Sequence, residues 1–292
     1  MTATAPPVRV VEHTAAYRSV GPVRVRSPPD RGDRPDTRRQ DGGRTASGVA
    51  RRRSATVCDV QPPGPLLASG RDADIFEYGP GLVLRRSRRG RSMAGEARTM
   101  DYLRGHGYPV PAVEEISEDG TDLVIERISG SSMVDFMSRR PWSIRRQGMV
   151  LADLHRRLHA IAPPDFLPPA PVGPGDCFLH MDLHPLNVMI SGKGPVVIDW
   201  PNAARGDPAV DVILAWVLMA AGEVRSSPVM RVVEVWGRGS LVKGFLAGFG
   251  SELEDLKHKV RDVVAFKVQD PNMSAAEQRA MWAVVEKFEV TA

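Results

Sequence analysis

From residue 66 onward, short apolar runs alternate with turn residues, a pattern typical of small antiparallel strands. Residues 75–78 and 82–85 are the first two runs, and the Gly-Pro-Gly turn between them predicts a β-hairpin. Residues 113–116 and 123–128 repeat this arrangement around a Glu-Asp-Gly turn and predict a second hairpin. The two hairpins together predict one small antiparallel sheet.

One helix is expected between the two hairpins. Four apolar residues recur there at helical spacing and share one face: Met93, Ala97, Met100 and Leu103. Ser92 can cap the first turn of this helix, and Gly105 and Gly107 can end the last turn. We therefore expect residues 61–129 to form a first lobe of antiparallel strands and one helix.

Beyond residue 130 the apolar positions mostly follow the helical period. One amphipathic stripe consists of Leu151, Leu154, Leu158 and Ile161. Residues 211–221 are apolar on all sides, as expected for a helix at the centre of a domain. Further helical patterns cover residues 228–248, 251–267 and 274–288. The predicted fold class is α+β, in which a small antiparallel sheet lobe precedes a larger, mostly helical lobe in residues 130–292.

The first 60 residues follow neither the helical nor the strand period and are rich in Pro, Gly, Arg, Thr and Ser. They hold twelve arginines against six acidic residues, a net charge of +6, whereas the whole chain carries +4. Their few apolar residues cannot offset the entropy of ordering, so we expect a disordered basic tail. An arm for nucleic acid or anionic lipid would use the same arginines. Because Tyr17 is the one aromatic residue available for base stacking, we do not expect nucleic-acid contact.

Cysteine content and hydropathy indicate the cellular compartment in which the protein is expected. Cys58 and Cys177 are the only cysteines in the sequence, which excludes a disulfide framework and a Cys-based zinc site. The longest apolar run, residues 212–221, is too short for the ~20 residues that a membrane-spanning helix needs. The N-terminus also lacks the apolar core of a signal peptide. We expect a cytoplasmic protein without a membrane span.

Residues with catalytic chemistry flank a third predicted hairpin, residues 188–198, in which two apolar runs surround a Ser-Gly-Lys-Gly-Pro turn. Asn187 directly precedes the first strand and Asp199 directly follows the second, so the hairpin brings both to its open end. Asp182 lies five residues before Asn187 on the entering loop. An amide oxygen and a carboxylate suit Mg²⁺, a hard cation. The carboxylate of Asp182 then stays free to accept a proton.

The two segments around this hairpin read His-x-Asp-Leu-His-Pro-x-Asn and Ile-Asp-Trp, with Asn187 and Asp199 twelve residues apart. This pair of motifs resembles the aminoglycoside phosphotransferase-like family of small-molecule kinases. The resemblance implies a two-lobed, protein-kinase-like fold and transfer of the γ-phosphoryl group of ATP to a hydroxyl of a small molecule, with Mg²⁺. It further implies that Asp182 is catalytic and orients or deprotonates the hydroxyl, and that Asn187 and Asp199 bind the metal.

The same resemblance implies nucleotide-binding residues in the first lobe. Gly70 lies where the turn that covers the phosphates is expected, and main-chain groups near Glu126 and Ile128 would bind adenine at the interlobe hinge. Arg85 stands where kinases have a phosphate-binding lysine, and Glu96 is placed to pair with it. Arginine keeps the charge but is bulkier and differently shaped, so its role here is a hypothesis. An ordinary turn at Gly70, a plain edge strand at the hinge and a solvated Arg85 pair are the alternatives.

Two other classes of function stay open. A protein kinase-like enzyme would need a platform for a peptide, but only 11 residues separate Asp199 from Asp211. This spacing favours a small acceptor and fits the resemblance, in which Asp211 braces the catalytic loop from the start of a helix. A catalytically inactive nucleotide-binding module is suggested by Arg85. However, all three polar residues of the catalytic motifs are present.

The acceptor could be an aminoglycoside, another antibiotic or a metabolite. Aminoglycosides are polycations that require a strongly acidic cleft, which a folded part carrying a net charge near −2 does not demand. Glu252, Glu254 and Asp255 could nevertheless lie on the substrate side. His155 and His159 have the spacing of metal ligands on a helix, but no third ligand is near in sequence. We interpret both histidines as packing residues.

Overall fold

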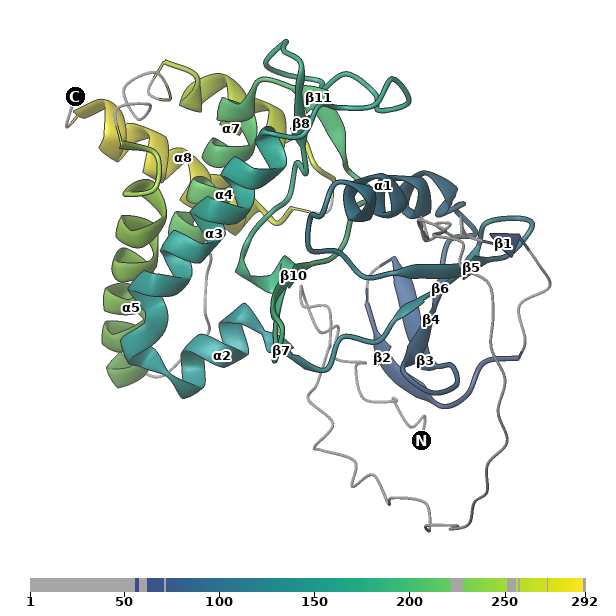
Figure 1. Ribbon diagram of the computed structural model, residues 1–292. Helices are drawn as coiled ribbons and strands as arrows, with labels where there is room; N and C mark the ends of the chain where they lie inside the picture. The colour runs from purple at the N-terminus through teal and green to yellow at the C-terminus, as the bar shows by residue number, and fades with distance from the viewer. Residues whose placement is uncertain are drawn as a thin grey trace, which may run out of the picture.

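The computed structural model describes residues 56–57, 62–70, 72–221, 228–250, 256, 258–271 and 273–290. Two lobes are evident, one built on a sheet and one built mainly of helices (Figure 1). The predicted tail, residues 1–60, lies outside the described residues apart from Thr56–Val57. None of the helices in the described ranges is long and apolar enough to cross a membrane.

The smaller lobe contains a six-stranded sheet in the order β1-β5-β6-β4-β3-β2. Its strands are β1 (Thr56–Val57), β2 (Leu66–Ser69), β3 (Ala73–Glu77), β4 (Leu82–Ser87), β5 (Val113–Ile116) and β6 (Asp122–Glu126). Neighbouring strands are antiparallel except β1 and β5. Helix α1 (Ala94–Gly105) packs against β5. Both predicted hairpins and the predicted helix are thus present.

Two details of this lobe differ from the sequence pattern. Met93, not Ser92, is the N-cap residue of α1, although the Ser92 hydroxyl accepts a hydrogen bond from the Ala94 amide at 3.3 Å. Strand β1 precedes residue 61, where the sequence pattern predicts the start of the lobe. Such a short strand is specified by its pairing with β5 and not by a local period.

The larger lobe contains helices α2 (Met133–Arg139), α3 (Ile144–His159), α4 (Pro208–Ala221), α5 (Pro228–Leu246), α7 (Val260–Lys267) and α8 (Ala275–Val290). Strands β7 (Gly130–Ser132), β9 (Val188–Ser191) and β10 (Gly194–Val197) form one small sheet, and β8 (Cys177–Leu179) pairs with β11 (Ala204–Gly206). Most residues of α4 are buried, which confirms a central helix. Of the helix expected over residues 251–267, residues 251–255 and 257 lie outside the described residues.

The two lobes share one continuous cluster of buried apolar residues. Helix α1 and the loop after it are also joined to the larger lobe by hydrogen bonds. The Tyr102 hydroxyl donates to the Ala162 carbonyl at 2.9 Å, and the Tyr108 hydroxyl donates to the Leu154 carbonyl at 3.0 Å. Helix α1 is therefore fixed relative to the lobe that carries the catalytic motifs.

Helices α3 and α5 approach each other closely because glycines lie at their contact. A Cβ atom added at Gly148 would lie 2.3 Å from the Leu241 carbonyl oxygen, and one added at Gly244 would lie 2.1 Å from the Arg145 carbonyl oxygen. Backbone atoms cannot move aside as a flexible side chain can, so these two positions exclude side chains.

We predict that Gly244→Ala destabilises the protein although alanine is the better helix former. The added methyl group should force α3 and α5 apart and lower the free energy of unfolding by about 1–3 kcal/mol. Gly239→Ala, in the same helix, is the matched control, because a Cβ there meets nothing within 4 Å. This control should raise stability by up to ~1 kcal/mol. Denaturant unfolding of both variants measures the difference, and a stabilised Gly244→Ala would contradict the prediction.

Candidate active site

The loop that carries Asp182 is held by a buried carboxylate. Asp211, in the first turn of α4, accepts hydrogen bonds from the amides of His180 at 2.8 Å and Met181 at 2.6 Å. His159 Nε2 lies 3.3 Å from the same carboxylate. Burial raises the pKa of Asp211, but the hydrogen bond and charge of His159 outweigh burial and lower it. Asp211 therefore braces the loop as an ionised group.

Two non-glycine residues of the site have left-handed backbone conformations. Met181 has a φ of 66° and Asp199 a φ of 70°. This region is unfavourable for side chains other than Gly, Asn and Asp, so surrounding contacts must hold Met181 in it. The hydrogen bond from its amide to Asp211 is one such contact. The unusual backbone thus lies directly before Asp182 and at Asp199 itself.

The hairpin β9–β10 brings Asn187 and Asp199 together, as its predicted register requires. Val188 pairs with Val197, and the Ile198 amide donates to the Asn187 carbonyl at 3.0 Å. The Asn187 side-chain nitrogen donates to the Asp182 carbonyl at 2.9 Å, so Oδ1 is the side-chain atom that could bind a cation. The Asp199 side chain is 41% exposed. One amide oxygen and one accessible carboxylate fit the hard-ligand chemistry of Mg²⁺.

Arg85 connects the sheet lobe to Asp199, one of these two candidate metal ligands. Its guanidinium forms an ion pair with Glu96, as the sequence suggested, and its Nη2 also lies 3.4 Å from Asp199 Oδ1. Glu96 is only 6% exposed and accepts a further hydrogen bond from the Trp200 amide at 3.2 Å. The sequence pattern did not predict this second contact of Glu96. It joins α1 to the residue that follows Asp199.

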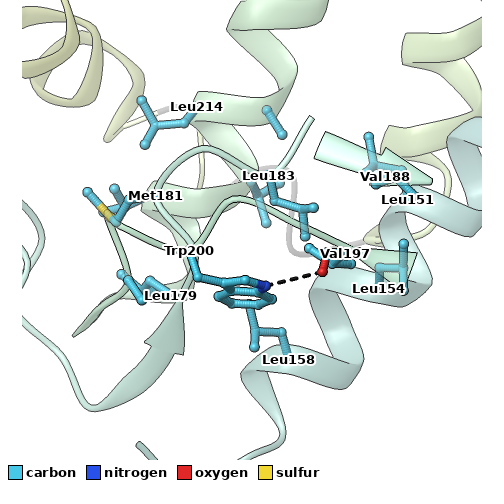
Figure 2. Packing of buried hydrophobic residues seen from close by; sticks show 14 of the residues in the cluster. Leu151, Leu154, Leu158, Leu179, Met181, Leu183, Val188, Val197, Trp200 and Leu214 are labelled. Carbon is cyan, nitrogen blue, oxygen red and sulfur yellow. Dashed lines mark hydrogen bonds between the residues drawn. The ribbon is translucent and has the colours of Figure 1, made fainter. Parts of the chain in front are cut away.

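Trp200 anchors the segment that carries Asp199. Its ring is buried among Tyr108, Phe178 and His180, with Leu158 close by in Figure 2. The indole Nε1–H donates to the Val197 carbonyl at 3.2 Å, so its polar atom is also satisfied. An aromatic residue directly after Asp199 thereby fixes the backbone from which this carboxylate projects.

The three other nucleotide-binding candidates lie in the sheet lobe and at its junction. Gly70 lies in the turn between β2 and β3, where its amide donates to the Ala73 carbonyl at 2.9 Å. The Glu126 amide donates to the Ala112 carbonyl at 2.8 Å, so that amide is already used within the lobe. The Glu126 carbonyl and the main chain of Ile128 are the groups that could meet an adenine ring. Glu126 is the last residue of β6, and Ile128 lies between β6 and β7.

Asp182 has two cationic or titratable neighbours. Lys267 Nζ lies 3.4 Å from Oδ1, and His184 Nε2 lies 3.6 Å from Oδ2. Burial raises the pKa of Asp182, but the hydrogen bond and charge of His184 and the charge of Lys267 hold it well below its ordinary value. Lys267 was not among the residues predicted from sequence. It is 85 residues away in the chain, and no local motif marks it.

His155 and His159 contribute to packing and to the brace. His155 is buried, bonds the Leu151 carbonyl through Nδ1 at 2.8 Å, and packs edge-on against Phe245. Burial lowers the pKa of His155 to about 4, so this ring is neutral at pH 7. In the part of the chain that the structure describes, no group of three His, Cys, Asp or Glu side chains is placed to hold a metal ion.

We predict that Asp211→Asn lowers stability at pH 7 by about 2 kcal/mol, because the neutral amide weakens two hydrogen bonds from buried amides. The pKa of Asp211 is depressed in the folded protein, so its stabilisation is present above the ordinary value of 3.8 and is lost as pH falls below it. The deficit of the variant should therefore shrink towards pH 3. Asp153→Asn, on an exposed part of α3, is the matched control. Thermal unfolding from pH 3 to 8 measures both, and a deficit independent of pH would contradict the assigned role.

The profile of the family described as "Phosphotransferase enzyme family" (APH) matches residues 65–174 and 165–257, more than half of the 292-residue chain. No curated protein matches the chain.

Solved structures similar to the chain include three small-molecule kinases. An aminoglycoside-3'-phosphotransferase of type VIII shares 19% identity, with 82% of this chain and 95% of that chain covered and a TM-score of 0.49. A choline/ethanolamine kinase family protein from Mesorhizobium loti shares 17% identity, with 78% and 88% covered and a TM-score of 0.47. The amicoumacin kinase hAmiN shares 14% identity, with 81% and 91% covered and a TM-score of 0.45. Because the profile covers more than half of the chain, including residues 180–187 and 198–200, the chain belongs to the phosphotransferase enzyme family.

Proposed function

We propose that the protein transfers the γ-phosphoryl group of ATP to a hydroxyl of a small molecule. The observation that carries this proposal is the convergence of Asp182, Asn187 and Asp199 on one braced loop and hairpin, with Arg85 arriving from the other lobe. A hydroxyl-orienting carboxylate, two metal ligands and a phosphate-neutralising cation are the parts that phosphoryl transfer requires.

In this proposal the nucleotide lies between the lobes. The turn at Gly70 covers the phosphates, and the main chain near Glu126 and Ile128 meets the adenine. Arg85, oriented by Glu96, neutralises phosphate oxygens in place of the usual lysine. Asn187 and Asp199 would hold Mg²⁺, which when bound supplies further positive charge to those oxygens.

Asp182 acts on the acceptor. Its carboxylate is ionised throughout the physiological pH range and can accept a hydrogen bond from the acceptor hydroxyl. A carboxylate with a depressed pKa is a weak base, so its main contribution is to align the oxygen with the phosphorus. It accepts the hydroxyl proton when transfer is well advanced and that proton has become acidic.

The chain after Asp199 favours a small acceptor over a protein. It forms β11 at Ala204–Gly206, paired with β8, and enters α4 at Pro208. This short, paired connection leaves no extended platform on which a peptide could lie. A protein kinase-like activity is therefore the less supported alternative.

We predict that Asp182→Ala abolishes phosphoryl transfer but preserves Mg-ATP binding, whereas Asp199→Ala weakens Mg-dependent binding itself. The reason is that Asp182 faces the acceptor, whereas Asp199 is a metal ligand. ATP consumption by the purified chain against hydroxylated metabolites and antibiotics, with calorimetry of nucleotide binding, measures both effects. Asp176→Ala, on an exposed loop, is the control and should behave as the parent. Turnover by Asp182→Ala at the parent rate would refute the assignment.

We predict that Arg85→Ala raises the KM for ATP and lowers kcat, together by about 10- to 100-fold in kcat/KM, because a charged hydrogen bond to phosphate is lost. Arg86→Ala is the matched control, since Arg86 pairs with Asp122 at 2.6 Å and takes no part in the Glu96 pair. Steady-state kinetics at varied ATP concentration distinguish the two variants. Equal values for Arg85→Ala and the parent would instead favour an inactive nucleotide-binding module.

A further inference from the structure

A lysine of the larger lobe lies beside the acceptor end of the site. Lys267 is the last residue of α7, and its Nζ lies 3.4 Å from Asp182 Oδ1 and 3.8 Å from Asp270 Oδ2. Its side chain is only 15% exposed. Arg85 reaches the site from the sheet lobe and contacts Asp199, the metal-ligand side. Lys267 contacts the hydroxyl-orienting carboxylate from the helical lobe.

The position of this lysine is fixed by the surrounding helices. Helix α7 packs against α4, which carries Asp211, and against α8 (Figure 1). Val268 caps the C-terminus of α7, and its amide donates a hydrogen bond to the Val264 carbonyl at 3.0 Å. From α8, Gln278 donates a side-chain hydrogen bond to the Val268 carbonyl at 3.0 Å. The lysine and the braced loop are thus held by the same group of helices.

An ammonium beside Asp182 affects which alcohols can react there. The acceptor hydroxyl must approach the Asp182 carboxylate, so its neighbouring substituents come close to Lys267. A substrate ammonium at that distance would be repelled by Lys267, and the Asp182 charge that could attract it is already paired. Asp270 Oδ2 lies 3.8 Å from the same ammonium, farther than Asp182 Oδ1 at 3.4 Å. Neutral hydroxyls or a carboxylate can instead accept hydrogen bonds from the ammonium.

We propose that Lys267 sets the charge of the acceptor, so that the enzyme phosphorylates alcohols whose groups next to the reacting hydroxyl are neutral or anionic. Polyols, sugars and hydroxy acids belong to this class, whereas amino alcohols and polycationic aminoglycosides do not. The inference rests on the proposed function. Glu252, Glu254 and Asp255, which the sequence suggested as an acidic substrate side, lie outside the described residues and do not enter it.

The test uses the full chain, Mg-ATP and acceptors that share a skeleton but differ in charge. Suitable sets are glycerol, 3-amino-1,2-propanediol and glycerate, and glucose, glucosamine and gluconate, with kanamycin as a polycation. The parent should favour the best neutral or anionic acceptor over its ammonium counterpart by at least about tenfold in kcat/KM. Lys267→Glu should shift this ratio towards the ammonium acceptor, and Lys267→Arg should preserve it.

Lys259→Met, at the N-cap of α7, is the matched control, because Lys259 pairs with Asp207 at 2.5 Å and not with Asp182. It should keep the parent's ratio between charged and neutral acceptors. A ratio is informative because general damage to the fold lowers transfer to all acceptors alike. The parent's own ratio tests the proposal even where a variant fails to fold.

The inference is overturned if the parent prefers ammonium acceptors, if Lys267→Glu leaves the ratio unchanged, or if no neutral or anionic alcohol is phosphorylated while Mg-ADP binds. Calorimetry with Mg-ADP separates these results from a failure of the proposed function. A parent chain that binds no Mg-nucleotide would overturn the proposed function itself. Normal nucleotide binding with efficient kanamycin phosphorylation would overturn only the acceptor class.

Discussion

The carboxylate of Asp211 fixes the backbone from which the catalytic loop projects. It accepts hydrogen bonds from two successive amides, one of them on Met181, whose left-handed conformation requires such support. The helix that carries Asp211 is buried on nearly every side and contacts α7 and α8. The placement of Asp182, and of the lysine beside it, therefore follows from the packing of one central helix.

Glu96 has the corresponding role between the lobes. It accepts from Arg85 of the sheet and from the Trp200 amide of the larger lobe. Because Trp200 directly follows Asp199, a single buried carboxylate relates the position of Arg85 to that of Asp199. Hydrogen bonds from Tyr102 and Tyr108 also hold α1 and the loop after it against the larger lobe. The position of Arg85 relative to Asp199 therefore does not depend on Glu96 alone.

Structural elements that are specified by neighbouring residues in the chain could be predicted from the sequence. Elements that depend on contacts with distant segments could not. Asn187 and Asp199 meet because a short hairpin joins them, and the apolar runs on either side of its turn specify that hairpin. Strand β1 and the pairing of β8 with β11 have no comparable local signal, because their partners lie far away in the chain. No local signal marks Lys267 either, because its partner Asp182 lies 85 residues away in the chain. Lys267 lies beside Asp182 because of how α7 packs. The Arg85–Glu96 pair, in contrast, could be inferred from the family resemblance.

The connection between Asp199 and α4 has a consequence for regulation. In kinases with a long activation segment, phosphorylation orders that segment and switches the enzyme on. Here the corresponding stretch is pinned by Trp200, by the pairing of β11 with β8 and by the start of α4. In the proposed activity, the residues that act on nucleotide and acceptor are therefore held by contacts of the fold itself and not by a separately ordered segment.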